Sequence, residues 1–214
     1  MQDHPNFSDD QRPFCYIHSC TLANKGTKRL EHLINTLIAS KLIDQLAKIV
    51  ILNIGIPISG QLGDRFEVDN YSDNPRLYEI PTINRIRNHP INQPILYIHT
   101  KGISYNDDYQ QENDWIDMML YFLINRSTDC LEHLKTVDVV GCNYSSEPRP
   151  HFSGNFWWAN AEYLRRLPKL PESGDNKMDA EMWLFQANPK YYQIHSSGIN
   201  HFVERYPPER YVNT

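Results

Sequence analysis

The sequence predicts an α/β domain with a central, mostly parallel mixed sheet that is flanked by helices. Two observations support this fold class. Segments with strand character alternate along the chain with segments whose apolar residues recur at intervals of three and four. Two of the strand-like segments, KIVILNIG (48–55) and ILYIHTKG (95–102), begin as unbroken apolar runs, which is typical of central strands covered on both faces.

The first third of the chain predicts a strand, a helix and a second strand. FCYIHS (14–19) has strand character, and a helix is expected between residues 28 and 46. Its apolar face consists of Leu30, Leu33, Ile34, Leu37, Ile38, Leu42 and Ile43. The buried strand at 48–55 completes a βαβ unit, which is the usual start of a parallel sheet.

The middle of the chain continues the alternation. A short strand (66–70) precedes a helix (82–88), which Pro81 can start at its first position. After the strand at 95–102, a helix is expected to run to about residue 134. Its apolar face contains Trp115, Met118, Met119, Phe122 and Leu123. A strand at 137–144 follows.

The last third mixes prolines with aromatic residues and has the composition of a site rather than a scaffold. We expect helices at 160–167 and 179–186 and a closing strand at 191–198. A chain of 214 residues suits a single core of ordinary size. We therefore predict one domain over residues 13–214, preceded by a frayed segment at 1–12.

Composition excludes several classes of protein. Hydrophobic residues make up 40% of the chain and the formal net charge is -5, so the chain is not of the disordered type. A mild acidic excess also argues against sequence-independent binding of nucleic acid, which requires a surplus of Lys and Arg. The four cysteines form no CxxC pair, which favours reduced thiols over disulfides or structural zinc.

The sequence contains no segment that predicts export or membrane insertion. The opening residues, MQDHPNFSDDQRP, lack the basic start and apolar core of a signal peptide. No apolar run approaches the roughly 20 residues that span a bilayer. We therefore expect a cytoplasmic protein without a transmembrane segment.

Polar residues follow the predicted strands where ligands of α/β sheets usually bind. Ligands of open sheets lie beyond the carboxyl ends of the strands. The candidates by this criterion are His18, Ser19, Asn53, His99, Thr100, Lys101 and Gly102. Lys101 beside Gly102 suits a phosphate oxygen, although the GxxxxGK[ST] and GxGxxG loops are absent. The alternative is that these residues cap strand ends in solvent.

The stretch HFSGNFWWAN (151–160) is the most unusual in the chain. The polar residues His151, Ser153 and Asn155 bracket Gly154 immediately before Phe156 and two tryptophans. Trp157 and Trp158 cannot both face one core if the backbone is extended, so at least one is expected to line a cleft or pack across it. Aromatic faces stack on sugar rings or bases. The alternative is an aromatic core beneath a loop.

Two carboxylates and two histidines near the C-terminus are further candidates. Asp179 and Glu181 fall at the predicted start of a helix, where the macrodipole alone favours acidic residues. The apolar neighbours of Glu181 can raise a carboxyl pKa toward the range of a general base. His195 and His201, with Asp107 and Asp108 from a polar loop, are candidate metal ligands; the alternatives are structural histidines and a charged turn.

Several motifs, taken together, resemble those of a known protein family. They are HTKG at the end of the fourth strand, YEIPTINRI before it, DWIDMMLYFL after it, and then HFSGNFWWANAEYLRRLP and AEMWLF. This set resembles small proteins of bacteria and large DNA viruses that are assigned as glycosyltransferases of the GT-A, nucleotide-sugar-binding architecture. The resemblance spans residues 14–202. It implies a single GT-A-like, Rossmann-like domain.

The resemblance also implies roles for the candidate residues. The first βαβ half, with His18, Ser19 and Asn53, would hold the nucleotide, and the stretch from His99 to Gly102 would hold the sugar diphosphate. GT-A enzymes usually place an Asp-x-Asp motif and a divalent cation there. This chain has His99-Thr100-Lys101, so either Lys101 replaces the cation or Mn²⁺ or Mg²⁺ is held elsewhere.

By the same resemblance, Glu181 would be the catalytic base, with Asp179 in reserve. The pocket for the sugar and acceptor would be lined by His151, Ser153, Gly154, Asn155, Trp157 and Trp158. The implied activity is transfer from a nucleoside-diphosphate sugar, first of all a UDP-sugar, to a glycan or glycoprotein, in the host cytoplasm if the source is viral. Two alternatives stay open: a non-catalytic binding module, and a metal-dependent hydrolase of phosphoesters or nucleotide sugars.

Overall fold

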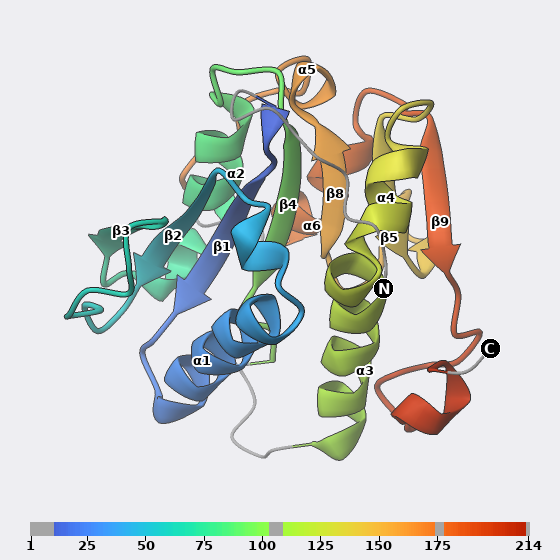
Figure 1. The fold of residues 1–214 in the computed structure, drawn as a ribbon, viewed down its shortest axis with the longest axis horizontal. Helices are drawn as coiled ribbons and strands as arrows, with labels where there is room; N and C mark the ends of the chain where they lie inside the picture. Colours follow the sequence, from blue (N-terminus) through green and yellow to red (C-terminus); the bar gives the residue numbers. More distant parts are fainter. Residues whose placement is uncertain (1–10, 103–108, 174–177, 213–214) are drawn as a thin grey trace.

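The computed structural model describes residues 11–102, 109–173 and 178–212, and these contain a seven-stranded mixed sheet (Figure 1). The strand order is β3 (Phe66–Ser72), β2 (Lys48–Ile54), β1 (Phe14–Cys20), β4 (Pro94–His99), β8 (Trp157–Asn160), β5 (Val139–Cys142) and β9 (Tyr191–His195). All neighbouring strands are parallel except that β8 is antiparallel to both β4 and β5. The predicted α/β class with a mostly parallel mixed sheet is confirmed.

Helices cover both faces of the sheet (Figure 1). One layer contains α1 (Asn24–Ala39), α3 (Gln110–Leu120) and α4 (Ser127–His133), and the other contains α2 (Ile80–Arg87), α5 (Ala161–Leu164) and α6 (Met178–Met182). Two separate hydrophobic clusters correspond to these layers, because successive residues of each strand point to opposite faces. A two-stranded sheet, β6 (Tyr144–Ser145) with β7 (His151–Phe152), lies outside the main one.

The first helix begins and ends earlier than the predicted range of 28–46. Gly26 lies in its first turn, and a Cβ at this position would meet the carbonyl oxygen of Cys20 at 1.8 Å. Only glycine therefore lets the helix start this close to β1. The helix stops at Ala39 because Lys41 adopts a left-handed conformation with φ of 61°, and a 3₁₀ turn (Leu42–Asp44) follows.

The predicted helix ending near residue 134 is interrupted. A π-helical turn at Tyr121–Asn125 separates α3 from α4. Strand β8 was not predicted, because its four residues lie in a stretch that has the composition of a loop. The main chain at residues 1–10 is outside the described part, so the prediction of a frayed start stays a prediction.

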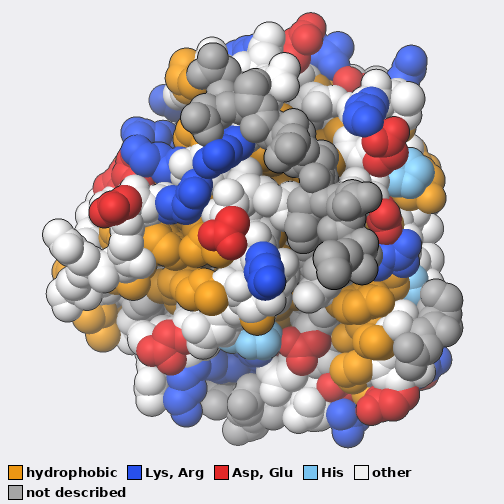
Figure 2. Space-filling model, viewed as in Figure 1, with side chains coloured by type: hydrophobic (Ala, Val, Ile, Leu, Met, Phe, Trp, Pro, Cys, Tyr) orange, Lys and Arg blue, Asp and Glu red, His pale blue; other side chains and the backbone are white. Residues whose placement is uncertain are grey.

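The parallel strands β1, β2, β4, β5 and β9 end at one edge of the sheet, and β8 begins there. Figure 1 shows α1 and α3 beginning at the same edge, which lies at the bottom of the view. No helix in the described residues is both long and apolar enough to cross a membrane. Figure 2 shows basic and acidic side chains interspersed over the face that α1, α3 and α4 cover, with apolar areas between them.

Candidate functional site

A buried polar cluster lies where β1 and β4 end beneath the start of α2. Glu79 is at its centre. One carboxylate oxygen, Oε2, accepts hydrogen bonds from the Tyr97 hydroxyl at 2.9 Å and from the Asn155 side-chain amide at 2.6 Å. The other, Oε1, faces Nδ1 of His99 at 3.5 Å. Strand β4, the turn before β8 and the start of α2 thus converge on one carboxylate.

The backbone around Glu79 is strained. Tyr78 has φ of 49° and ψ of -139°, a conformation that non-glycine residues rarely adopt and that persists only where the surroundings impose it. Glu79 occupies the N-cap position of α2 without capping the helix through its side chain, and Pro81 follows in the first turn. The strained residue and the proline together direct the carboxylate toward the strand ends rather than toward its own helix.

A left-handed turn supplies the opposite wall of the cluster. Gly154 has φ of 96° and Asn155 has φ of 56°. This turn brings the Gly154 carbonyl within 3.0 Å of His99 Nε2 and aims the Asn155 amide at Glu79. The Asn155 side-chain oxygen accepts a hydrogen bond from the Trp157 indole at 3.0 Å, which fixes the orientation of its amide.

His99 is a neutral imidazole with a defined tautomer. Burial, and next to it the Lys101 cation, lower the pKa of His99 to about 3, against smaller opposing effects of the Gly154 carbonyl and Glu181. Since a carbonyl only accepts, Nε2 must carry the proton that is donated to Gly154. Nδ1 therefore presents a lone pair toward Glu79.

His18 extends the cluster toward β1. Its Nδ1 pairs with the Thr82 hydroxyl of α2 at 2.9 Å. Burial lowers the pKa of His18 to about 4, although the Glu79 carboxylate opposes this shift. His18 is therefore held neutral at neutral pH, and it links the end of β1 to the start of the helix that carries Glu79.

Lys101 lies two residues after His99, which is the last residue of β4. Its ammonium lies 4.2 Å from the centre of the Trp115 ring, a distance typical of a cation–π contact. The next residue, Gly102, has φ of 79°, and a Cβ there would meet the Glu112 carboxylate at 2.1 Å. Lys101 thus places one cation at the edge of the sheet, and Gly102 lets α3 approach the end of β4 closely.

The short helix α6 brings a second carboxylate to this edge. Glu181 is half-buried and close enough to His99 to raise the pKa of that imidazole against the effect of burial. Asp179 lies instead 3.9 Å from the Arg149 guanidinium. The nearby His151 bonds through Nδ1 to the Arg149 carbonyl at 2.8 Å and through Nε2 to Ser153 at 3.3 Å.

Of three other candidates, Thr100 and Asn53 hold loops together, whereas Ser19 does not. The Thr100 hydroxyl accepts a hydrogen bond from the Cys20 amide at 2.9 Å, which ties β4 to β1. Asn53 bonds to Thr21 at 3.0 Å and to Asn70 at 3.1 Å. Ser19 is fully buried, and its hydroxyl has no hydrogen-bond partner among the described residues. Thr100 and Asn53 thus position the strand-end loops.

The two tryptophans of HFSGNFWWAN do not line a pocket, contrary to the expectation. Both are fully buried, Trp157 in the cluster beneath α2 and Trp158 in the cluster beneath α1 and α3. The antiparallel strand β8 sends them to opposite faces of the sheet. The Trp158 indole donates to the Leu123 carbonyl at 2.7 Å. Neither ring is exposed to a pocket. Both tryptophans therefore belong to the aromatic core that was the alternative interpretation.

The candidate metal ligands do not converge within the described residues. His195 pairs with the Tyr206 hydroxyl at 3.1 Å, and His201 pairs with Ser197 at 2.8 Å. No group of three His, Cys, Asp or Glu side chains suited to a metal ion occurs in residues 11–102, 109–173 and 178–212. Asp107 and Asp108 lie outside the described residues. At the end of β4 the imidazole, hydroxyl and ammonium do not fit Mn²⁺ or Mg²⁺, which prefer oxygen ligands.

Sequence reasoning missed Glu79 and Tyr97. Both fall in segments with an obvious structural explanation, because an acidic residue before a helix suits the macrodipole and a tyrosine in a buried strand suits the core. The available signals were the motif YEIPTINRI (78–86), which contains Glu79, and the position of Glu79 immediately before Ile80-Pro81, where a helix start turns the chain toward the strand ends. The hydrogen bonds that join these residues are contacts between distant segments.

Comparison with solved structures supports the fold. The bifunctional IspDF from Campylobacter jejuni resembles this chain with a TM-score of 0.50 at 8% identity, over 94% of this chain and 54% of the IspDF chain. This chain therefore spans about half the length of IspDF, and at such low identity the likeness concerns the fold alone. With the observed sheet, it confirms the predicted GT-A-like α/β fold.

A second solved structure was also similar, and the curated proteins gave no match. The crystal structure of Rv0371c from Mycobacterium tuberculosis H37Rv has a TM-score of 0.48 at 10% identity, over 88% of this chain and 90% of that one. No curated protein matches the sequence. Residues 73–212 match a family model that includes Glu79, the HTKG segment and the β8 turn. Since this match covers well over half of the chain, the protein belongs to the family described as Domain of unknown function (DUF8361).

Proposed function

We propose that this protein transfers a sugar from a nucleoside-diphosphate sugar, with UDP-sugars as the first candidates, to a glycan or glycoprotein acceptor. The observation that carries the proposal is the arrangement at the end of β4. His99 is the last residue of the strand, Lys101 follows two residues later, and Glu181 is near enough to oppose the lowering of the His99 pKa. One cation and one carboxylate at the ligand-binding edge of a GT-A-like sheet are the two charges that such a transfer needs. The motifs that resemble glycosyltransferases include this segment.

In the proposed reaction, an acceptor hydroxyl attacks the anomeric carbon of the sugar. The bond from that carbon to the diphosphate oxygen breaks, and the diphosphate leaves with the electron pair. Glu181 accepts the proton of the attacking hydroxyl, and Lys101 stabilises the charge on the leaving diphosphate. His18, Ser19 and Asn53 belong to the proposed nucleotide side, and His151, Ser153, Gly154 and Asn155 to the side of the sugar and acceptor.

The proposal is tested by binding and turnover with a panel of nucleotide sugars, each with Mn²⁺ and with EDTA. Release of nucleotide that depends on an acceptor supports transfer. The absence of a thermal shift with every nucleotide would refute the proposal. Metal-dependent release without any acceptor would favour the hydrolase, and binding without turnover would favour the non-catalytic module.

Two substitutions examine the assigned roles. Glu181→Gln should leave donor binding intact and abolish turnover, and unchanged turnover would remove the assignment of the base. Lys101→Ala should weaken binding of UDP more than binding of uridine, because only UDP carries the diphosphate. The matched control is Lys135→Ala. Lys135 is about 68% exposed and pairs with Glu132 at the end of α4, so its removal should change neither affinity.

A further inference from the structure

With a neutral His99 and an ionised Glu79, the contact between these two side chains contains two hydrogen-bond acceptors and no donor. His99 Nε2 donates to Gly154, so the neutral ring has only a lone pair at Nδ1. Oε1 of Glu79, 3.5 Å away, is also an acceptor, and the two donors that reach this carboxylate, from Tyr97 and Asn155, are bound to Oε2. Among the described residues, no donor hydrogen-bonds to Oε1 or to Nδ1.

Such an arrangement is unfavourable unless a ligand supplies the donors. Two acceptors that face each other repel unless a third group donates hydrogen bonds to them. Both side chains keep some exposed surface, 9% for His99 and 23% for Glu79, so a ligand can reach them. The strain at Tyr78 and the fixed amide of Asn155 hold the carboxylate in place before any ligand arrives.

We propose that Glu79 Oε1 and His99 Nδ1 form a paired acceptor that binds two neighbouring hydroxyl groups of the transferred sugar. Each hydroxyl donates one hydrogen bond, the first to the carboxylate and the second to the imidazole. This inference rests on the proposed function and adds to it the part of the substrate that the site recognises. A vicinal diol on a sugar ring has the required two donors side by side.

The location of the pair supports this assignment. Lys101 and Glu181 both act on His99 electrostatically, so the diphosphate, the sugar and the proposed base would surround one imidazole. Glu79 and His99 also lie on the α2 face of the sheet, in the same layer as α6. A sugar bound between the phosphate and Glu181 would therefore lie on the same face of the sheet as the paired acceptor.

Glu79→Gln removes both acceptors while keeping the shape of the site. The Gln oxygen can still accept from Tyr97 and Asn155, and its amide can then donate to His99 Nδ1. We expect the affinity for UDP alone to change by less than about twofold. The additional affinity that the sugar contributes, measured as the ratio of the Kd of UDP to that of UDP-glucose, UDP-galactose or UDP-N-acetylglucosamine, should fall roughly ten- to hundredfold. Isothermal titration calorimetry measures both values.

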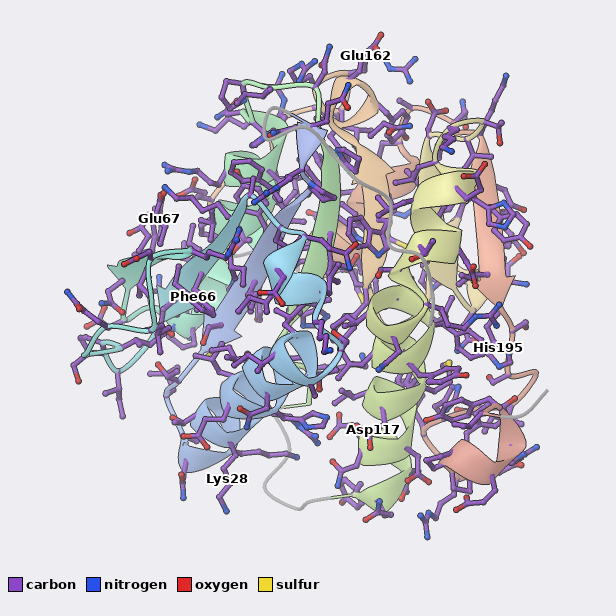
Figure 3. All side chains as sticks on the ribbon, viewed as in Figure 1. Lys28, Phe66, Glu67, Asp117, Glu162 and His195 are labelled. Carbon is purple, nitrogen blue, oxygen red and sulfur yellow. The ribbon has the colours of Figure 1, made fainter. Side chains whose placement is uncertain are left out.

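The matched control is Glu162→Gln. Glu162 is exposed on α5, and Figure 3 places it at the edge of the molecule opposite Lys28 and Asp117. This control should keep both affinities. Equal weakening of UDP and the UDP-sugars by Glu79→Gln would overturn the inference, because a merely structural carboxylate would act that way. Retention of the full sugar contribution would overturn it as well.

A second measurement varies the ligand as well as the protein. Monodeoxy analogues of the best donor should bind the unaltered protein more weakly when either of two neighbouring hydroxyls is missing, and Glu79→Gln should be insensitive to the same deletions. Equal sensitivity in both proteins would refute the paired acceptor. If the unaltered protein binds no nucleotide sugar, the proposed function and the inference fail together; if it binds and only the sensitivity is absent, the inference alone fails.

Discussion

Two regions of the same sheet edge contain buried histidines but are built in different ways. In the polar corner, formed by Glu79, His99 and Asn155, hydrogen bonds and left-handed turns fix the side chains. In the stacked corner, stacked rings and charged groups fix the side chains. This corner is formed by Trp115, Lys101, His201, Phe202 and the Arg205–Asp114 pair. The His201 ring lies parallel to Trp115, with centroids 4.9 Å apart.

The difference indicates separate tasks for the two corners. Directional hydrogen bonds with unused acceptors suit recognition of a polar ligand, whereas stacked rings tolerate small shifts and suit the attachment of one segment to another. The stacked corner attaches the chain after β9 to α3, and Arg205 donates to Asp114 at 2.8 and 3.2 Å. Lys101 lies at this junction, so the stacked corner positions the cation and the polar corner the proposed sugar.

The largest expected effect comes from the turn of the polar corner. Gly154→Ala would place a Cβ 2.5 Å from the Met119 sulfur in a backbone with φ of 96°. Strain and overpacking together should lower the free energy of unfolding by roughly 2–5 kcal/mol. The control is Gly198→Ala, with φ of 69° and no atom within 4 Å, which should cost only about 1–2 kcal/mol. Urea unfolding measures both, and equal losses would show that packing against α3 contributes nothing.

The next effect is on pH dependence, and it compares the histidines of the two regions. The pKa is lowered from 6.5 to about 4 in His18 and His201 and to about 3 in His99, with burial as the main cause. The unfolded chain therefore binds more protons below pH 6.5, and stability should fall as the pH drops from 6.5 toward 4. Each group contributes at most about 1.4 kcal/mol per pH unit.

Urea unfolding at pH 7 and pH 5 tests this prediction. Replacing either His18 or His201 with Asn should reduce the loss of stability between the two pH values, because one titrating group is removed. If only His18→Asn reduces the loss of stability, the pH dependence arises from the polar corner and not from the stacked corner. A pH dependence that neither substitution changes would contradict the prediction.

Much of the fold could be predicted from the sequence, because it depends on local patterns. The apolar runs of β2 and β4 and the helical spacing from Leu30 onward are visible without any tertiary information. Strand β8 could not be predicted, since four residues in a Gly/Pro-rich region carry no period. Its position between β4 and β5 is fixed by pairing with both neighbours.

The candidate site could be predicted only in part, for a related reason. Strand ends can be found from the sequence, and His99 and Lys101 were identified in that way. Glu79 acquires its significance from Tyr97 and Asn155, which are 18 and 76 residues away. The burial of both tryptophans likewise depends on β8 being a strand. Contacts between distant segments therefore decide which polar residues of a motif form a site.

A smaller effect is expected from the ion pair of the stacked corner. Arg205→Ala would leave the nearly buried Asp114 without its cationic partner. Because the Arg205 side chain is itself about 57% exposed, the free energy of unfolding should fall, but by less than for Gly154→Ala. Arg210→Ala, which breaks an exposed pair with Glu204, is the control and should change it by less than about 0.5 kcal/mol. Indistinguishable effects would mean that Asp114 needs no cation.

The smallest effect on stability, but an informative one, is expected from Lys101→Met. The methionine keeps an apolar chain against Trp115 and loses the cation–π contact, so the free energy of unfolding should fall by no more than about 1 kcal/mol. Binding of UDP should nevertheless weaken about tenfold or more, since the ammonium is the proposed partner of the diphosphate. Lys135→Met is the matched control for both measurements. A large loss of stability with unchanged binding would make Lys101 part of the stacked corner only, and the diphosphate would then require another partner.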